Sequence, residues 1–174
     1  TWFVLQSHSG YSYSDSRTYA WGQANDMPMP GDFDGDALTD LAVFRPQGLF
    51  GSAPAGNWNI RYSSNQFNPA TATSFAWPTF HFDPQAVSLL ADFSGDGKQD
   101  FVAYSPSRGE WNIIFTSVSA PVPVGGGPLN SMQWGLPGDV PVPADFDGDG
   151  KADLAVWRPS SGTWSPLKRV PGPS

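Results

Sequence analysis

The sequence predicts an all-β protein with the fold class of a β-propeller, in which four-stranded blades are arranged in a ring. The first observation is repetition: Trp2, Trp58, Trp111 and Trp164 share a local pattern and follow one another at steps of 56, 53 and 53 residues in a chain of 174. The second is period, because apolar residues alternate over short segments and no segment sustains the spacing of a helix. The third is that Gly, Pro, Ser and Asn interrupt these segments every several residues, as turns between strands require.

Each repeat is expected to contain four short strands. The first precedes an aspartate-rich loop, and the second is the apolar segment after that loop, at 41–46, 101–106 and 154–159. The third carries the repeated tryptophan, and the fourth ends at Trp-Gly or Trp-Pro. We place a single domain over 1–174, with repeats at approximately 2–57, 58–110 and 111–163 and a C-terminal tail at 164–174.

The two ends of the chain are expected to complement each other. The first two strands, at roughly 2–6 and 18–22, lack inner partners, and the last inner strands, at roughly 140–158, lack outer ones. Three repeats are fewer than the roughly four to eight blades with which propellers close. The chain is therefore predicted either to belong to a larger propeller or, as the matching ends favour, to form a homodimer that completes a six-bladed ring.

Negative charge is concentrated in three loops. The chain has 16 acidic and 9 basic residues, and eleven of the acidic ones lie within 32–40, 92–100 and 145–153. Without these eleven acids, the chain carries 5 acidic and 9 basic residues and has no extended basic stripe, which excludes nucleic acid as a partner. No apolar run is long enough for a membrane span, and the absence of cysteine excludes disulfides and thiolate sites.

The three aspartate-rich loops are predicted to bind Ca²⁺, up to three ions per chain. Calcium takes about six to eight oxygen ligands, which alternate positions of a loop can supply. Positions 1, 3, 5, 7 and 9 are Asp32, Asp34, Asp36, Leu38 and Asp40 in the first loop, Asp92, Ser94, Asp96, Lys98 and Asp100 in the second, and Asp145, Asp147, Asp149, Lys151 and Asp153 in the third, with position 7 offering its backbone carbonyl. Ala37 replaces the second glycine of the first loop, which predicts strain and weaker calcium binding there. The alternative is that these loops are ordinary Asp-Gly turns whose carboxylates cap backbone N–H groups.

The motif Asp-Phe-Asp-Gly-Asp-Gly-Lys-Ala-Asp-Leu-Ala-Val at 145–156, echoed at 32–43 and 92–103, resembles the FG-GAP/VCBS-type repeats of bacterial extracellular proteins and, more distantly, the propeller of integrin alpha subunits. This resemblance implies a secreted bacterial protein with a calcium-stabilised propeller. Because that family includes adhesins, lectin-like modules and domains attached to enzymes, the motif is specific for the repeat and poorly specific for function.

The expected function is non-catalytic binding or adhesion, with a glycan or an extracellular protein as the ligand. The sugar-stacking candidates are Trp21, Trp77, Trp134, Tyr11 and Tyr13, although a repeated tryptophan is also a common packing residue. An alternative is an accessory or catalytic part of a polysaccharide-degrading enzyme, and another is a structural spacer or assembly domain. The sequence offers an enzyme little material beyond two histidines and the acids Asp15, Asp26, Asp83, Asp139 and Glu110.

Overall fold

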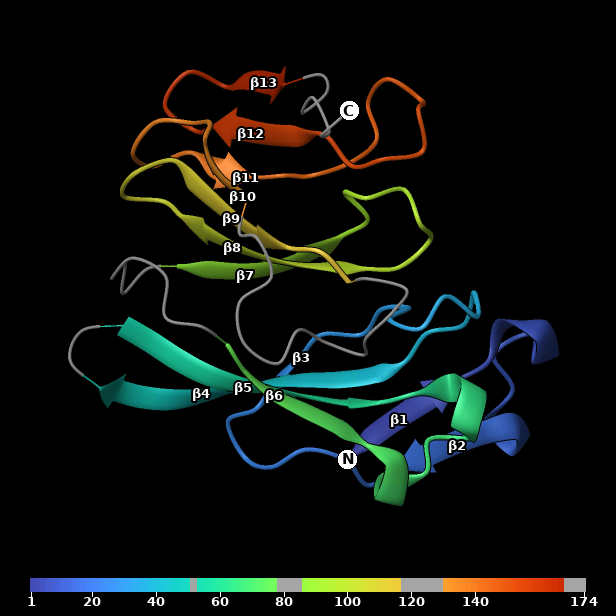
Figure 1. Cartoon of the computed structure of the whole chain (residues 1–174). Helices are drawn as coiled ribbons and strands as arrows, with labels where there is room; N and C mark the ends of the chain where they lie inside the picture. The colour runs from blue at the N-terminus through green and yellow to red at the C-terminus, as the bar shows by residue number, and fades with distance from the viewer. Residues whose placement is uncertain (51–52, 78–85, 117–129, 168–174) are drawn as a thin grey trace.

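The computed structural model describes residues 1–50, 53–77, 86–116 and 130–167 and contains four antiparallel sheets (Figure 1). The N-terminal hairpin consists of β1 (Trp2–Leu5) and β2 (Ser16–Tyr19). Sheet 1 consists of β3 (Met27–Pro28), β4 (Leu41–Phe50), β5 (Ala53–Arg61) and β6 (Thr73–Trp77), and sheet 2 consists of β7 (Val87–Ala91), β8 (Asp100–Ser105), β9 (Glu110–Ile114) and β10 (Asn130–Gln133). Sheet 3 consists of β11 (Val140–Pro141), β12 (Leu154–Arg158) and β13 (Thr163–Leu167). The all-β prediction is confirmed. Within the described ranges, no helix has the length and apolar character needed to cross a bilayer.

The predicted order of strands holds within the sheets. In sheets 1 and 2, neighbouring strands are consecutive along the chain, and the aspartate-rich loop joins the first strand to the second. The register also repeats, because Trp58 lies opposite Phe44, Trp111 opposite Tyr104, and Trp164 opposite Trp157. Each sheet begins before an aspartate-rich loop, so the sheets are offset from the repeat boundaries that we set at the tryptophan strands.

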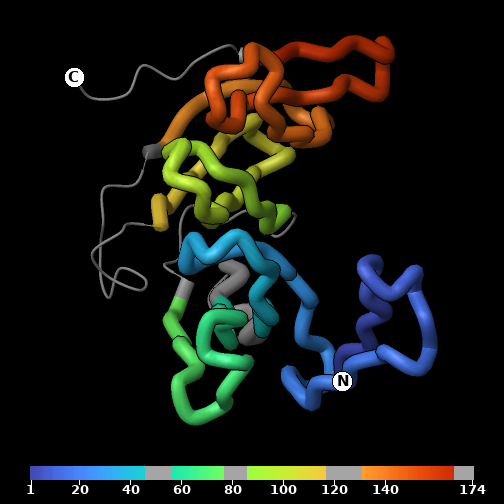
Figure 2. Tube along the Cα trace, turned by 90° about the vertical axis from the view of Figure 1, so that its right-hand side faces the viewer, coloured from blue at the N-terminus to red at the C-terminus, as the bar shows by residue number. Residues whose placement is uncertain are grey.

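The sheets stack on one another, with the hairpin and sheet 3 at opposite ends of the stack (Figures 1 and 2). One core between sheets 1 and 2 contains Phe33, Trp58, Ile60 and Phe101. The equivalent core between sheets 2 and 3 contains Phe93, Trp111, Ile113 and Leu154. In both, the loop phenylalanine and the tryptophan strand of one sheet pack against the residue that follows the aspartate-rich loop of the next sheet.

The described part of the chain is an open stack and does not close into a propeller, so that part of the fold prediction stays a prediction. Among the described residues, the hairpin has no inner strands, as expected. The expectation that the last inner strands lack outer partners needs correction, because β13 pairs with β12 from Leu154 to Arg158. Only the place of a fourth strand is unfilled in sheet 3 within the described residues.

Two partly buried ion pairs connect the start of a sheet to the end of its second strand. Arg45 donates from Nε and Nη2 to the two carboxylate oxygens of Asp26, each at 2.8 Å, and Arg158 does the same to Asp139. The Asp26 and Asp139 side chains are 3 % and 1 % exposed. In sheet 2 the equivalent positions are Ala86 and Ser105, so both partners of the pair change together.

Replacing Arg158 by glutamine should lower the melting temperature, because it leaves the buried Asp139 carboxylate without its cation. The Arg158 hydrogen bonds hold the pKa of Asp139 below its usual value, so the pair stabilises the fold above pH about 4 and loses this effect as the pH falls through the lowered pKa. Thermal melts of both proteins between neutral and acidic pH check this, and we expect the difference to shrink at acidic pH. A difference that stays constant down to the lowest pH would contradict it.

Candidate metal centre

The three aspartate-rich loops have the same backbone fold, organised by the aspartate at position 1. In the third loop, the backbone N–H groups of Gly148 and Gly150 donate to the two oxygens of Asp145 at 2.6 and 3.0 Å. Asp32 and Asp92 accept the same pair of bonds from positions 4 and 6 of their own loops. These bonds are the caps that the turn alternative predicts, and they leave lone pairs on each oxygen that a cation can also use.

Positions 4 and 6 of every loop lie in the left-handed region of backbone space. At position 6, Gly97 and Gly150 have φ of 84° and 86°, whereas Ala37 in the first loop has φ of 65°. The predicted strain at Ala37 is therefore present, because a side chain disfavours this conformation by about 1–2 kcal/mol.

Replacing Ala37 by glycine should stabilise the protein by about 0.5 kcal/mol, because the released strain exceeds the entropy that glycine adds to the unfolded chain. Chemical denaturation in EDTA measures this change without a contribution from metal. The matched control is Gly150→Ala in the third loop, where added Cβ meets open space and only backbone strain is introduced. We expect it to destabilise the protein, and a loss of stability in both variants would contradict the strain argument.

The aspartate at position 9 is buried and holds the loop to the rest of its sheet. Asp40 accepts from the backbone N–H of Phe33 and of Ser63, each at 2.8 Å, and Asp100 accepts from Phe93 at 2.8 Å and Thr116 at 2.7 Å. Burial raises the pKa of Asp40 and of Asp100 to about 6, against the opposing effect of these backbone donors. In the first and second loops, position 9 thus acts as a structural clamp without the need for a cation.

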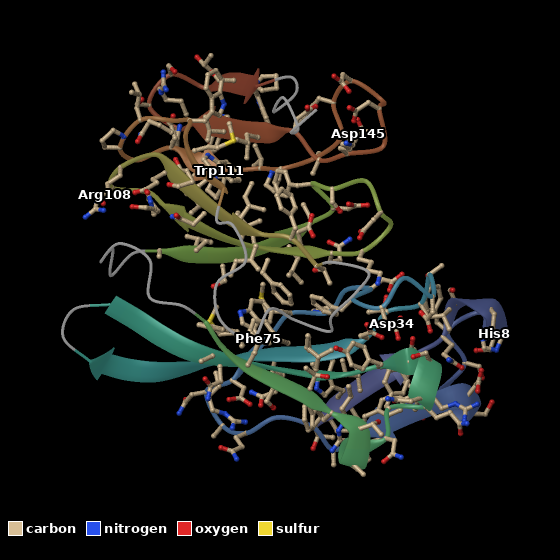
Figure 3. All side chains as sticks on the ribbon, in the orientation of Figure 1. His8, Asp34, Phe75, Arg108, Trp111 and Asp145 are labelled. Carbon is tan, nitrogen blue, oxygen red and sulfur yellow. The ribbon has the colours of Figure 1, made fainter. Side chains whose placement is uncertain are left out.

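The loops also contact each other along the stack. The backbone N–H of Gln99 donates to the carbonyl of Asp32, and that of Ala152 donates to the carbonyl of Asp92, both at 2.7 Å. A Cβ placed on Gly35 would lie 3.0 Å from Cε of Lys98, so this lysine covers the preceding loop. Lys151 covers Gly95 in the same way, with its Cγ 2.9 Å from such a Cβ. The three loops therefore form one column on a single side of the molecule, where Figure 3 shows Asp34 and Asp145.

Carboxylate oxygens converge in two of the three loops. One oxygen from each member of the trio Asp32, Asp34 and Asp36, and of the trio Asp145, Asp147 and Asp153, lies within 4.8 Å of the others. The second loop is wholly described and forms no such trio, since Ser94 takes position 3 and its hydroxyl donates to Asp92 at 3.2 Å. The structure thus brings together six of the predicted ligands, and places Asp40 and Asp149 outside these two trios.

The two trios differ in the hydrogen-bond donors that their carboxylates already have. In the first loop, the hydroxyls of Ser63 and Ser64 donate to Asp36 and Asp34, the Ser63 bond being 2.7 Å long. The third loop shares the backbone donors to position 1, which lower the pKa of Asp145 with Gly150 as the main cause, but no serine hydroxyl of the described residues donates to the two exposed members of its trio. Since carboxylates this close repel one another without a cation, the third loop is the stronger candidate site.

The aromatic residues predicted to bind sugar fall into two groups. Tyr11 and Tyr13 are 64 % and 85 % exposed. Trp134 packs against the core between sheets 2 and 3, and its indole N–H donates to the Ser165 carbonyl at 2.9 Å. The Arg61 guanidinium covers the ring of Trp21 at 4.1 Å. The side chain of Trp77 lies outside the described residues.

Several acids that an enzyme would need are engaged elsewhere. Asp26 and Asp139 hold the arginines of the two ion pairs, and Asp15 contacts His8 and Arg17 at 3.2 and 3.3 Å. Asp83 and His81 lie outside the described residues. The equal spacing of Asp26 and Asp139 before their loops was the sequence signal that could have revealed these pairs as structural.

Comparison with known proteins returned no matching family model, no matching curated protein and no matching solved structure. The assignment of function therefore depends on the geometry of the loops.

Proposed function

We propose that this chain is a calcium-stabilised β-repeat module that acts by binding, without catalysis, on the outside of a bacterial cell. The observation that carries the calcium assignment is the convergence of Asp145, Asp147 and Asp153 in the third loop, with the equivalent trio in the first. A cation in either loop cancels carboxylate repulsion and ties the strands on both sides of the loop together.

Calcium suits these loops better than other common metals. The donors are all oxygens, which excludes the soft metals that prefer sulfur and nitrogen. Calcium accepts irregular shells of carboxylates and carbonyls, whereas magnesium demands a near-octahedral shell and retains water. We expect two ions per chain, in the first and third loops, rather than the three that the sequence alone predicts.

The test measures calcium binding and its effect on stability. Titration calorimetry should give two sites, and calcium should raise the melting temperature relative to EDTA, since binding to the native state alone stabilises by mass action. Asp147→Asn should remove one site while keeping the shape of the side chain. Asp96→Asn is the matched control, because it removes the same charge from the loop that forms no trio.

Equal calcium binding by the two variants would remove the assignment to the third loop. Identical melting curves in calcium and EDTA, with no heat of binding, would establish the loops as simple turns.

Tyr11 and Tyr13 support carbohydrate as the ligand class. They are exposed aromatic side chains beside polar groups, the arrangement with which proteins hold sugar rings. The test is a glycan array in calcium, with Tyr13→Ala as the variant that should lose retention and Trp164→Ala as an exposed aromatic control. Retention that is the same in the wild type and Tyr13→Ala would exclude this patch.

A further inference from the structure

Neighbouring sheets share a repeated apolar contact, and at each end of the described stack only one side of this contact is present. At position 2 of the loops, Phe33 and Phe93 are 4 % and 8 % exposed because the next sheet covers them, whereas Phe146 is 44 % exposed. At the repeated tryptophan, Trp58 and Trp111 are fully buried and Trp164 is 59 % exposed. Phe146 and Trp164 of sheet 3 are therefore exposed where their counterparts in sheets 1 and 2 are buried.

The opposite end of the stack presents the other half of the same contact. Lys98 and Lys151 at position 7 cover the preceding loops, but their counterpart Leu38 is 61 % exposed. Between neighbouring loops, the backbone N–H at position 8 donates to the carbonyl at position 1 of the preceding loop. The corresponding groups at the two ends of the stack are the Asp145 carbonyl in the third loop and the Thr39 N–H in the first. The glycine that the next lysine would cover, Gly148, has open space above it.

A cavity lies at the hairpin end of the stack. It has a volume of about 550 Å³ and lies between the hairpin and sheet 1, lined by Trp2, Val4, Pro30, Leu38, Leu41 and Phe67 among others. In the core between sheets 1 and 2, the equivalents of Trp2, Val4 and Leu41 are Trp58, Ile60 and Phe101, and Phe33, Ala42 and Phe44 complete that core. In sheet 3, the residues equivalent to Phe33, Ala42 and Phe44 are Phe146, Ala155 and Trp157.

The strands at the two ends are also complementary. β1 pairs with β2, and its other edge has no partner strand among the described residues. β13 holds the third place in sheet 3 with an exposed Pro166 opposite Ala155, where the other sheets have the buried core residues Ile60 and Ile113. Proline cannot donate a ladder hydrogen bond, and β1 has Val4 at this position. β1 is therefore the better third strand for β12.

We propose that copies of this chain join head to tail by strand exchange. β11 and β12 of one copy enter the cavity of another and pair with its β1, which displaces β13 and completes a four-stranded sheet. By the repeated register, Phe3 then lies opposite Val156 and Val4 opposite Ala155. A second copy carries the elements that the repeat places beside β1: the loop phenylalanine, two inner strands and a position 1 carbonyl, that of Asp145.

This joint accounts for the most exposed apolar residue of β1. Phe3 is 82 % exposed in the single chain, and in the joined sheet it faces the same side as Val156, which packs on sheet 2. The contact is heterologous, so it closes into a ring or continues as a chain according to the rotation between copies. The joint does not depend on bound metal, which keeps it separate from the calcium proposal.

Disulfide trapping tests the joint in the full chain, which has no native cysteine. Phe3→Cys and Val156→Cys chains are mixed and mildly oxidised, in calcium and in EDTA, because opposed residues of antiparallel strands come within disulfide reach. We expect a covalent dimer from the mixture and none from either variant alone. The double variant Val156→Cys/Ser165→Cys tests the alternative, in which β13 stays paired with β12. It forms an intrachain disulfide if β13 keeps this position.

The mass of the unmodified chain in solution is the second measurement. Sedimentation should give a multiple of 18.7 kDa, and Phe146→Ser, which changes an exposed side chain of the single chain, should shift the distribution to the monomer. A monomer at high micromolar concentration would overturn the proposal. So would complete intrachain disulfide formation in the Val156→Cys/Ser165→Cys variant together with no covalent dimer from the Phe3→Cys and Val156→Cys mixture. Trapping in EDTA without any calcium binding would support the joint and remove only the calcium assignment.

Discussion

Replacing Trp111 by alanine should lower the free energy of unfolding by about 3 to 5 kcal/mol, among the largest effects expected of a single substitution. Trp111 is fully buried in the core between sheets 2 and 3, where its ring centroid lies 4.9 Å from that of Tyr104. Its indole N–H donates to the Trp134 carbonyl at 2.7 Å. The variant loses apolar contacts, creates a cavity and leaves that carbonyl without this donor.

Trp164 provides the matched control, since it occupies the same register on sheet 3 but is 59 % exposed. Trp164→Ala should change stability by less than about 1 kcal/mol. Chemical denaturation of both variants, in EDTA and at protein concentrations that keep the chain monomeric, measures the contrast. Equal destabilisation by the two substitutions would show that β13 is buried in solution and would contradict the arrangement of sheet 3 described above.

The sequence predicts the repeat and the strands because both arise from local patterns. Alternation, turn residues and the position of each aspartate-rich loop identify β3 to β10 in the correct order. The left-handed conformation at Ala37 follows from its alignment with Gly97 and Gly150, which is also a local property. These features need no knowledge of what a segment packs against.

The environment of each repeated residue could not be predicted in the same way. Trp58, Trp111 and Trp164 look equivalent in the sequence, but the first two are buried by a following sheet and the third is not. Likewise, the second loop resembles the other two, yet it forms no trio of converging carboxylates, because serine takes the place of the position 3 aspartate that both trios contain. Exposure and ligand geometry depend on contacts between units, which a repeat pattern does not encode.

The prediction of the tryptophan set as sugar platforms has the same weakness. Trp134 recurs at a strand end, and the sequence leaves open whether that position faces solvent or the next sheet. Its hydrogen bond to Ser165 of sheet 3 favours packing for this member of the set. The exposed tyrosines, by contrast, lie in an N-terminal segment that does not recur, where repetition gives no reason to expect packing.

Replacing Asp100 by alanine should destabilise the protein by roughly 3 kcal/mol or more, because an unpaired buried donor costs about 1–3 kcal/mol. Asp100 is fully buried and accepts from the backbone N–H groups of Phe93, Ser94 and Thr116 at 2.8, 3.0 and 2.7 Å. Removing the carboxylate leaves these donors without it. It also unfastens the second loop from the segment that follows β9.

The same variant separates the structural clamp from a metal ligand. Asp96→Ala is the control, since Asp96 lies in the same loop and accepts an exposed bond from Lys98. Thermal and chemical denaturation should show the Asp100→Ala loss in EDTA and in calcium alike, with little change in the control. If the loss occurs only in calcium, Asp100 acts as a ligand, and the second loop must reorganise to bind the ion. A loss of the same size without metal establishes that position 9 stabilises the loop by itself, and that the cation binds to a loop already formed by its backbone hydrogen bonds.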